Sequence, residues 1–182
     1  MTRVTLAQLD PTIALGPLDG RYRADAAPLV DHLSEAALNR NRIHVEVEWF
    51  IHLADAGVVP GTRELLDEER GHLRSIVTGF DQETISQLAM FEAVTVHDVK
   101  AVEYAIKEAL SHVGAEDLSE LVHFCCTSED INNLSYAVGI KDAVETVWLP
   151  RAAALIDALA AMALELAEVP MLSHTHGQPA TP

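Results

Sequence analysis

The 182-residue sequence predicts an all-α fold, and three observations lead to this prediction. Apolar residues recur at spacings of three and four over most of the chain from Ser34 onward, which is typical of amphipathic helices. No stretch alternates apolar and polar residues as a half-buried strand does. Apolar residues make up 49% and charged residues 22%, so the chain can bury a core and is not intrinsically disordered.

The chain is expected to open with an extended arm that ends in the turn Pro17–Tyr22, because prolines and glycines interrupt any period there. A long helix is expected from Ser34 to Ala56. Ser34 is a residue type that caps helix N-termini, and Gly57 stands where a helix commonly ends in the left-handed conformation.

Three further helices are predicted from their caps. Pro60–Thr62 interrupts the chain, and Thr62 is expected to cap a helix that ends at Gly79. Asp81 is expected to cap the next helix, and Asp98 to open the one after it.

The last part of the chain predicts its longest helices. After a short helical piece at 118–124, Ser128 is expected to cap a long helix that Pro150 interrupts, and an alanine-rich helix follows over Arg151–Glu168. That helix is apolar on nearly all faces, so it must be buried in a bundle or at an interface between chains. The large apolar residues concerned are Leu155, Ile156, Leu159, Met162, Leu164 and Leu166.

Charge and composition exclude several partners. The formal net charge of −16 disfavours nucleic acid and anionic membrane surfaces. Three carboxylates interrupt the apolar stretch 152–172, which a membrane span would not carry, and no signal peptide is evident. The adjacent Cys125 and Cys126 cannot form an ordinary disulfide and are expected to be a small buried pair in a reducing compartment. A cytoplasmic protein is therefore expected.

Three polar segments are candidates for chemistry. The turn at Arg21–Tyr22 offers guanidinium donors and a phenol, suited to a phosphate. His97–Asp98 at a helix start and His174–Gln178 in a polar loop place imidazoles where they can reach a ligand. His174 and His176 would face one way in an extended segment, but no further ligand cluster stands near, so no metal is expected.

The run Thr127–Asn133 is the densest polar segment, and two interpretations of it stay open. It is a helix cap followed by acidic residues that favour the helix dipole. It is equally a helix N-terminus whose hydroxyls and free N–H groups can hold a carboxylate or phosphate.

Taken together, four segments resemble the adenylosuccinate lyase family of the fumarase/aspartase superfamily, in the same order and at about the same spacing. The strings TSEDINN and THGQPATP are the most specific to it, and the similarity covers nearly the whole chain from Leu15. The four segments are Pro17–Tyr22, His97–Tyr104, Cys126–Asn133 and Thr175–Pro182.

The resemblance implies a lyase that eliminates fumarate from adenylosuccinate to give AMP, and from the succinyl-carboxamide intermediate of purine biosynthesis. The reaction is an anti β-elimination by general acid/base catalysis, with no cofactor or metal. Val96 stands where the family has Asn, which removes one amide contact. The matching positions are Arg21 and Tyr22 for nucleotide contacts, His97 and Asp98 for a second substrate-binding segment, Thr127 and Ser128 for the hydroxyls on a substrate carboxylate, and His176 for the general acid.

The resemblance also predicts the domain layout. Residues 1–24 would form an extended arm and substrate-binding turn, 25–114 the N-terminal helical domain, and 115–182 the truncated start of the long central helix bundle. Family members are homotetramers with a small-molecule nucleotide substrate, and the serine-rich loop with their catalytic base has no counterpart in this chain. An enzyme fragment is therefore expected. The alternative is a non-catalytic helical interaction module derived from the superfamily, and the gene sequence beyond Pro182 would distinguish the two.

Overall fold

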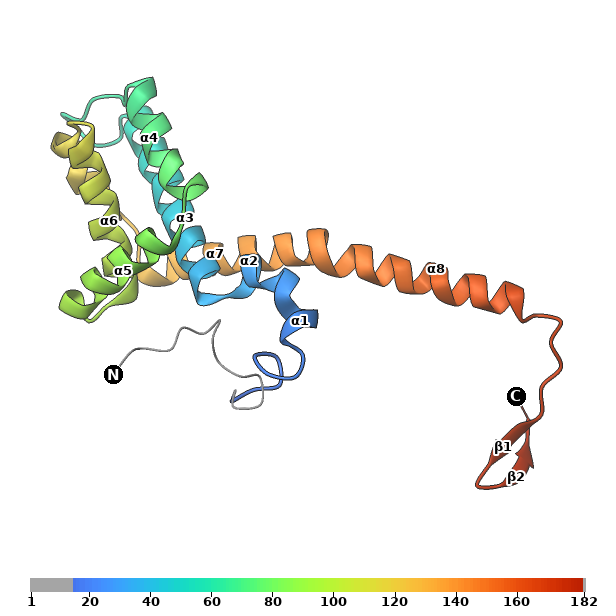
Figure 1. Cartoon of the computed structure of the whole chain (residues 1–182). Coiled ribbons are helices and arrows are strands. Elements are labelled where there is room, and N and C mark those ends of the chain that lie inside the picture. Colours follow the sequence, from blue (N-terminus) through green and yellow to red (C-terminus); the bar gives the residue numbers. More distant parts are fainter. Residues whose placement is uncertain (1–14, 182) are drawn as a thin grey trace. The chain divides into compact units, whose positions relative to one another are not determined.

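The computed structural model describes residues 15–181, so the predicted arm before Leu15 lies outside the described residues. These residues fall into two compact units that divide between Ala143 and Val144. The all-α prediction is confirmed: helices make up both units apart from one small hairpin (Figure 1). The domain boundaries expected at 24/25 and 114/115 stay predictions.

Seven α-helices and two 3₁₀ turns build the described part of the first unit. They are α1 (Arg23–Ala26), η3 (Ala27–Leu29), α2 (Val30–Leu33), α3 (Glu35–Ala56), α4 (Asp67–Thr78), α5 (Gln82–Thr95), α6 (Asp98–His112), η4 (Glu116–Leu121) and α7 (Ser128–Ala143).

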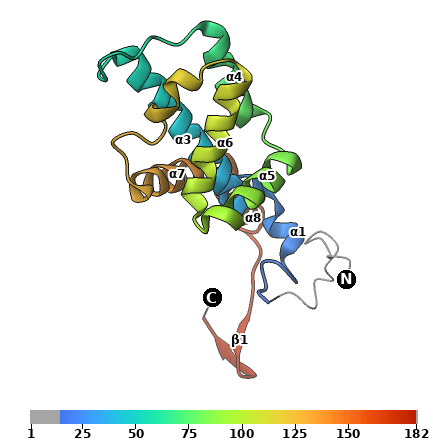
Figure 2. The ribbon, with the colours of Figure 1, turned by 90° about the vertical axis from the view of Figure 1, so that its left-hand side faces the viewer.

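Helix α3 is the centre of this unit, and its predicted ends are confirmed. The Ser34 hydroxyl accepts a hydrogen bond from the Ala37 N–H at 3.1 Å, and Gly57 ends the helix with φ = 58°. Helices α4, α6 and α7 all pack against α3 (Figures 1 and 2). Their shared core is apolar and tightly closed. Its largest fully buried side chains include Ile43, Phe50, Leu73, Ile106, Leu110 and Leu118.

The predicted cap of α4 was wrong by several residues. The Thr62 hydroxyl donates to the Val59 carbonyl at 2.7 Å and so closes a turn instead of starting a helix. Helix α4 begins at Asp67, where the Glu69 carboxylate accepts from the Leu66 N–H at 2.7 Å. The Arg63 guanidinium bonds to both Glu69 and Asp117, which holds the segment before α4 in an extended form.

Helices α5 and α6 both begin at a capping residue. Asp81 caps α5 as predicted, since its carboxylate accepts from the N–H groups of Glu83 and Thr84 at 3.0 Å. Helix α6 begins at Asp98 as predicted, and its cap is His97, whose Nδ1 accepts from the Lys100 N–H at 3.2 Å.

The packing of α7 on the preceding helices depends on a glycine. A Cβ atom on Gly139 would lie 2.7 Å from the backbone carbonyl oxygen of His32 and 3.2 Å from the Asn41 side-chain nitrogen. Asn41 in turn donates to the Ser135 carbonyl at 3.3 Å. The small residue at 139 therefore allows α7 to approach α2 and α3 closely.

The second unit contains a π-helical segment η5 (Val144–Trp148), helix α8 (Leu149–Glu165) and the strands β1 (Ser173–Thr175) and β2 (Gln178–Ala180). The expected interruption near Pro150 is present as a change of helix type: the α-helical pattern gives way to the π-helical segment, and α8 begins at Leu149 with Pro150 in its first turn. Helix α8 ends at Glu165, three residues before the predicted end.

The apolar character of α8 is as predicted, and in the part of the chain that the structure describes no residue of this helix is buried. By length and composition alone, the helical stretch Ser128–Glu165 would pass as a membrane-crossing helix, which for one helix is weak evidence. The expected absence of membrane contact stays a prediction.

The hairpin is a structure that the sequence analysis missed. Strands β1 and β2 pair antiparallel, with Thr175 opposite Gln178, and a two-residue loop joins them. His176 and Gly177 form that loop with φ of 49° and 78°. Positive φ at both loop residues matches the twist of a tight hairpin. Three-residue strands are too short for alternation to reveal them.

Candidate functional site

The start of α6 and the start of α7 meet, although the two segments lie far apart in sequence. The Ser128 Oγ lies 3.5 Å from His97 Nε2, across a separation of 31 residues. Both side chains are partly open to solvent. A hydroxyl and an imidazole from two of the predicted motifs are thus brought to one place.

The capping role of His97 fixes which imidazole nitrogen faces Ser128. Its Nδ1 is the acceptor for the Lys100 N–H, so the proton of the neutral ring lies on Nε2. The Nε2–H group and the Ser128 hydroxyl therefore form two adjacent hydrogen-bond donors. This pair suits one carboxylate group of a ligand.

The predicted cap of α7 was wrong by one residue. Thr127, not Ser128, is the cap: its N–H donates to the Asp130 carboxylate at 2.8 Å, and the Asp130 N–H donates back to its hydroxyl oxygen at 3.4 Å. The Thr127 N–H and the Thr127 hydroxyl, which donates to Asp130 Oδ2 at 3.0 Å, hold the pKa of Asp130 below its ordinary value. As a result, the Thr127 hydroxyl is engaged in the cap, whereas that of Ser128 is available to face His97.

Asp98 is held by a buried arginine from α3. The Arg42 Nη2 lies 2.6 Å from Asp98 Oδ2, and its Nε donates to Asn132 Oδ1 at 2.9 Å. Burial by itself would raise the pKa of Asp98, but the Val99 N–H and the Arg42 guanidinium outweigh this and keep that pKa below its ordinary value. Arg42 therefore ties α3, α6 and α7 together directly beside the His97–Ser128 pair.

Arg42 and Asn132 are site residues that sequence reasoning missed. Asn132 lies inside the TSEDINN string, so its motif was recognised but its role was not. Arg42 stands within a long helix among polar residues and carries no local signal. Only its burial, with 6% of the side chain exposed, distinguishes it.

Arg21 and Tyr22 lie at the turn before α1, as predicted. The backbone closes that turn through the Tyr22 N–H and the Pro17 carbonyl at 2.8 Å, and the Arg21 guanidinium lies 5.4 Å from the centre of the Tyr22 ring. Within residues 15–181, no hydrogen bond or ion pair joins either side chain to the His97–Ser128 pair. The structure thus places this pair of residues without bringing them to the same cluster.

His176 occupies the tip of the hairpin in the second unit, exposed to solvent. The extended segment in which His174 and His176 would face one way does not form, because His174 is in strand β1 and His176 is in the turn with φ = 49°. Among the residues that the structure describes, no three His, Cys, Asp or Glu side chains form a group that could hold a metal ion.

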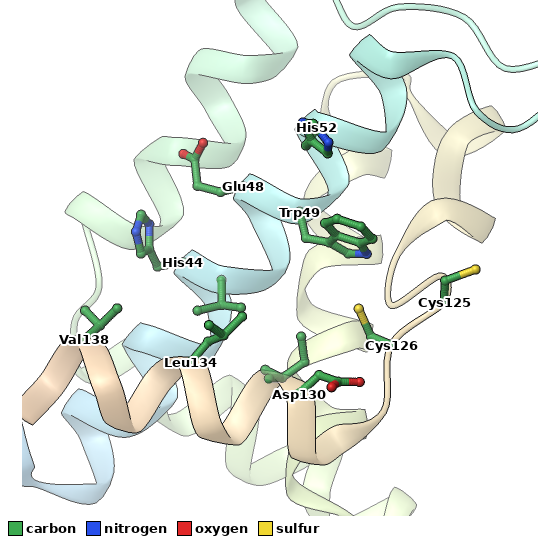
Figure 3. Close-up of a pocket in the computed structure, with 11 residues that line it drawn as sticks. His44, Glu48, Trp49, His52, Cys125, Cys126, Asp130, Leu134 and Val138 are labelled. Atoms are coloured by element: carbon green, nitrogen blue, oxygen red, sulfur yellow. The ribbon is translucent and has the colours of Figure 1, made fainter.

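A separate hollow of about 530 Å³ opens between α3 and α7 (Figure 3). It is mainly apolar and includes none of the predicted site residues. Its walls come from His44, Val45, Glu48, Trp49, His52, Cys125, Cys126, Asp130, Ile131, Leu134 and Val138.

The expectation of a buried cysteine pair was wrong. Cys125 is exposed and Cys126 is partly exposed. Burial, followed by the nearby carboxylates of Glu46 and Asp130, raises the pKa of Cys126 to about 11. The Cys126 thiol is therefore protonated at neutral pH and is a poor nucleophile.

Comparison with known proteins places these features in a family. The sequence profile of a family described as lyase matches residues 20–182. The chain belongs to this lyase family. The match extends over both compact units and includes every predicted site residue, from Arg21 to His176.

Curated relatives of this lyase-family chain agree with the resemblance seen in its motifs. It is 40% identical to adenylosuccinate lyase from Escherichia coli (strain K12) and 42% identical to that from Haemophilus influenzae, over 96% of the chain in both cases. It is 36% identical to adenylosuccinate lyase from Dictyostelium discoideum over the whole chain. The chain spans only 39–40% of the length of these relatives.

Proposed function

We propose that this lyase-family chain carries part of the active site of an adenylosuccinate lyase. The whole enzyme would eliminate fumarate from adenylosuccinate to give AMP, and from the succinyl-carboxamide intermediate of purine biosynthesis. The observation that carries the proposal is the meeting of His97 and Ser128, at 3.5 Å, from two separate motifs of the family. The 40% identity to proteins named adenylosuccinate lyase supports the same reading.

The chemistry requires a carboxylate to be held while a proton leaves the adjacent carbon. His97 Nε2–H and the Ser128 hydroxyl would donate to the substrate carboxylate as negative charge builds on it, the electrostatic part of the catalysis. Arg42 would keep Asp98, and with it the start of α6, in position. Thr127 would contribute through its cap of α7 unless the substrate displaces Asp130 from its hydroxyl.

The remaining roles belong to other segments. Arg21 and Tyr22 would contact the nucleotide, and His176 would protonate the departing purine nitrogen as the general acid. The catalytic base would come from sequence outside this chain, and no cofactor would take part. The whole enzyme would be a cytoplasmic homotetramer, in which segments of several subunits complete each site.

The proposal is tested by Ser128→Ala in a longer protein that contains this segment. We expect kcat/KM for adenylosuccinate cleavage to fall about 10²-fold or more, as for other donors to a developing oxyanion. Ser86→Ala is the matched control, because in the described part of the chain the Ser86 hydroxyl donates only to the Gln82 carbonyl of its own helix. An unchanged kcat/KM in Ser128→Ala would contradict the role of the His97–Ser128 pair.

The isolated 182-residue chain is expected to have no measurable lyase activity, since the proposed catalytic base would lie outside its residues. Fumarate release by the purified chain, with host enzyme excluded, would show that this expectation is wrong. If longer versions of the chain are inactive too, the alternative of a non-catalytic helical interaction module would be favoured.

A further inference from the structure

The connector between η4 and α7 has an unusual backbone. His123 and Cys125 adopt left-handed conformations, with φ of 62° and 59°, although neither is glycine. Two such residues within three positions are uncommon, and they persist only where surrounding contacts hold them. Thr127 and Ser128 follow directly, so the path of this connector sets where α7 begins.

Two residues of α3 hold the connector at consecutive positions. The Glu46 Oε1 lies 2.5 Å from His123 Nδ1, and the Trp49 Nε1–H donates to the Phe124 carbonyl at 2.9 Å. Glu46 and Trp49 are three residues apart in sequence and therefore lie on the same face of the helix. Figure 3 shows the Trp49 side chain between α3 and the connector that carries both cysteines.

Burying the Glu46 carboxylate beside the connector costs desolvation free energy. Its side chain is fully buried, and its second oxygen, Oε2, has no hydrogen-bond partner among residues 15–181. Burial raises the pKa of this carboxyl above its ordinary value in spite of the contact with His123. An apolar residue would avoid that desolvation, so packing alone does not account for Glu46.

His123 also reaches toward α6. Its Nε2 lies 3.9 Å from the Glu103 Oε1, and the other Glu103 oxygen accepts from the Lys100 Nζ at 2.7 Å. Lys100 is the residue whose N–H is bound by His97. Contacts thus run from α3 through the connector to the first turn of α6. The connector leads to Ser128 and the first turn of α6 follows His97, so these contacts join the two segments that carry the pair.

We propose that Glu46 and Trp49 are positioning residues that hold the 122–126 connector in its strained path and thereby set Ser128 against His97. The inference rests on the proposed function insofar as this pair binds a substrate carboxylate. The geometric part concerns this chain alone and is tested without catalysis.

The test measures amide hydrogen exchange and the His97 ring resonances by NMR in the 182-residue chain. Trp49→Phe keeps an aromatic ring of smaller size and removes the donor to Phe124. We expect exchange of the Thr127 and Asp130 amides to rise at least tenfold and the His97 ring resonances to shift, while amides in the α4 core around Leu73 keep their rates. Trp148→Phe, at an exposed tryptophan of the second unit, is the matched control.

Glu46→Gln provides a second variant, because it keeps an acceptor for His123 but removes the charge. It should give a smaller increase in exchange at the same amides than Trp49→Phe. The control is Glu48→Gln, two residues away on α3, whose carboxylate pairs with Arg74 of α4. If Trp49→Phe and Glu46→Gln leave these amides unchanged, or speed exchange equally throughout the first unit, the positioning role is wrong.

Fumarate added to each protein separates this inference from the proposed function. If fumarate changes the chemical shifts at Ser128, and these changes are smaller in Trp49→Phe, both the positioning role and the carboxylate site are supported. Faster exchange in the variant without fumarate shifts in any protein would support the positioning role and count against the carboxylate site. Equal fumarate shifts in wild type and variant, with unchanged exchange, would overturn the positioning role alone.

Discussion

Arg42 and Asp98 form an ion pair of 2.6 Å in which the guanidinium is buried and the carboxylate is half exposed. The remaining Arg42 donors bind Asn39 and Asn132, so the buried cation has a partner for each side of its fork. Loss of Asp98 would leave that cation without a counter-charge. The pair is therefore structural as well as part of the proposed site.

Asp98→Asn should destabilise the chain in a pH-dependent way. Because the folded state lowers the pKa of Asp98, its contribution is present above the ordinary value of 3.8 and is lost as the pH falls through the lower folded pKa. At pH 7 we expect the free energy of unfolding to fall by about 1–2 kcal/mol. Breaking a fully buried ion pair costs ~3–5 kcal/mol, but water screens Asp98. Urea unfolding at pH 7 and below pH 3.8 measures the difference.

The control for this prediction is Asp117→Asn. Asp117 pairs with Arg63, but both side chains are exposed and Arg63 keeps its bonds to Glu69. We expect a change below about 1 kcal/mol for that variant. An equal loss of unfolding free energy in the two variants would contradict the special role of the buried guanidinium. That role would also be contradicted if Asp98→Asn and wild type differed in stability as much below pH 3.8 as at pH 7.

Val96→Asn should stabilise the protein. Val96 ends α5 with φ = 52° and is 88% exposed, so a β-branched side chain occupies a left-handed position without gaining burial. Asn tolerates this conformation better, and we expect about 1 kcal/mol of added stability, or roughly 2–4 °C in Tm. Thermal unfolding measures it. Val94→Asn, equally exposed but inside the helix, should give no gain, and a gain there would contradict the backbone explanation.

The sequence predicted what depends on local signals. Ser34, Gly57 and Asp81 were assigned correctly because each bonds within a few residues of itself. Thr62 and Ser128 were misassigned as caps because a neighbouring residue satisfied the helix end instead. In both cases the deciding hydrogen bonds are local, but several polar residues stand within a few positions of the helix start, and the sequence does not indicate which of them makes the bond.

The candidate site was predictable only as separate motifs. His97 and Ser128 were each singled out, but the 3.5 Å contact between them follows from the packing of α6 and α7 on α3. Arg42, Glu46 and Trp49 bind residues that lie 56 to 90 positions away in the sequence. No short-range pattern reports such contacts. Sequence periodicity does not predict which distant residue pairs with a buried charge.

His176→Ala in a longer, active protein should depress kcat about 10²- to 10⁴-fold with KM within about threefold, because a general acid acts mainly in the transition state. His176→Asn should give the same loss while keeping a residue that tolerates the left-handed turn. Steady-state kinetics with adenylosuccinate measures both. The control is His174→Ala in strand β1. A kcat within about threefold of wild type would remove His176 from the acid role.

Helix α8 predicts self-association of the chain. Leu155, Ile156, Leu159 and Met162 are each 54–64% exposed, and Leu164 reaches 82%. Apolar burial contributes about 25 cal/mol per Å², so leaving this set in water costs several kcal/mol that a second copy can recover. Most soluble oligomers of one chain are symmetric, and the same helix on each copy can supply both sides of the contact.

We therefore expect sedimentation equilibrium to give a dimer or larger species at micromolar concentration. Leu159→Glu should shift it toward the monomer, because a carboxylate in the contact would be desolvated without a partner. Met90→Glu is the matched control, at a residue of α5 that is 66% exposed. A stable monomer of the wild-type chain at high concentration, or equal dissociation in the two variants, would contradict an interface at α8. In that case the apolar side chains of α8 would have to be covered within the monomer.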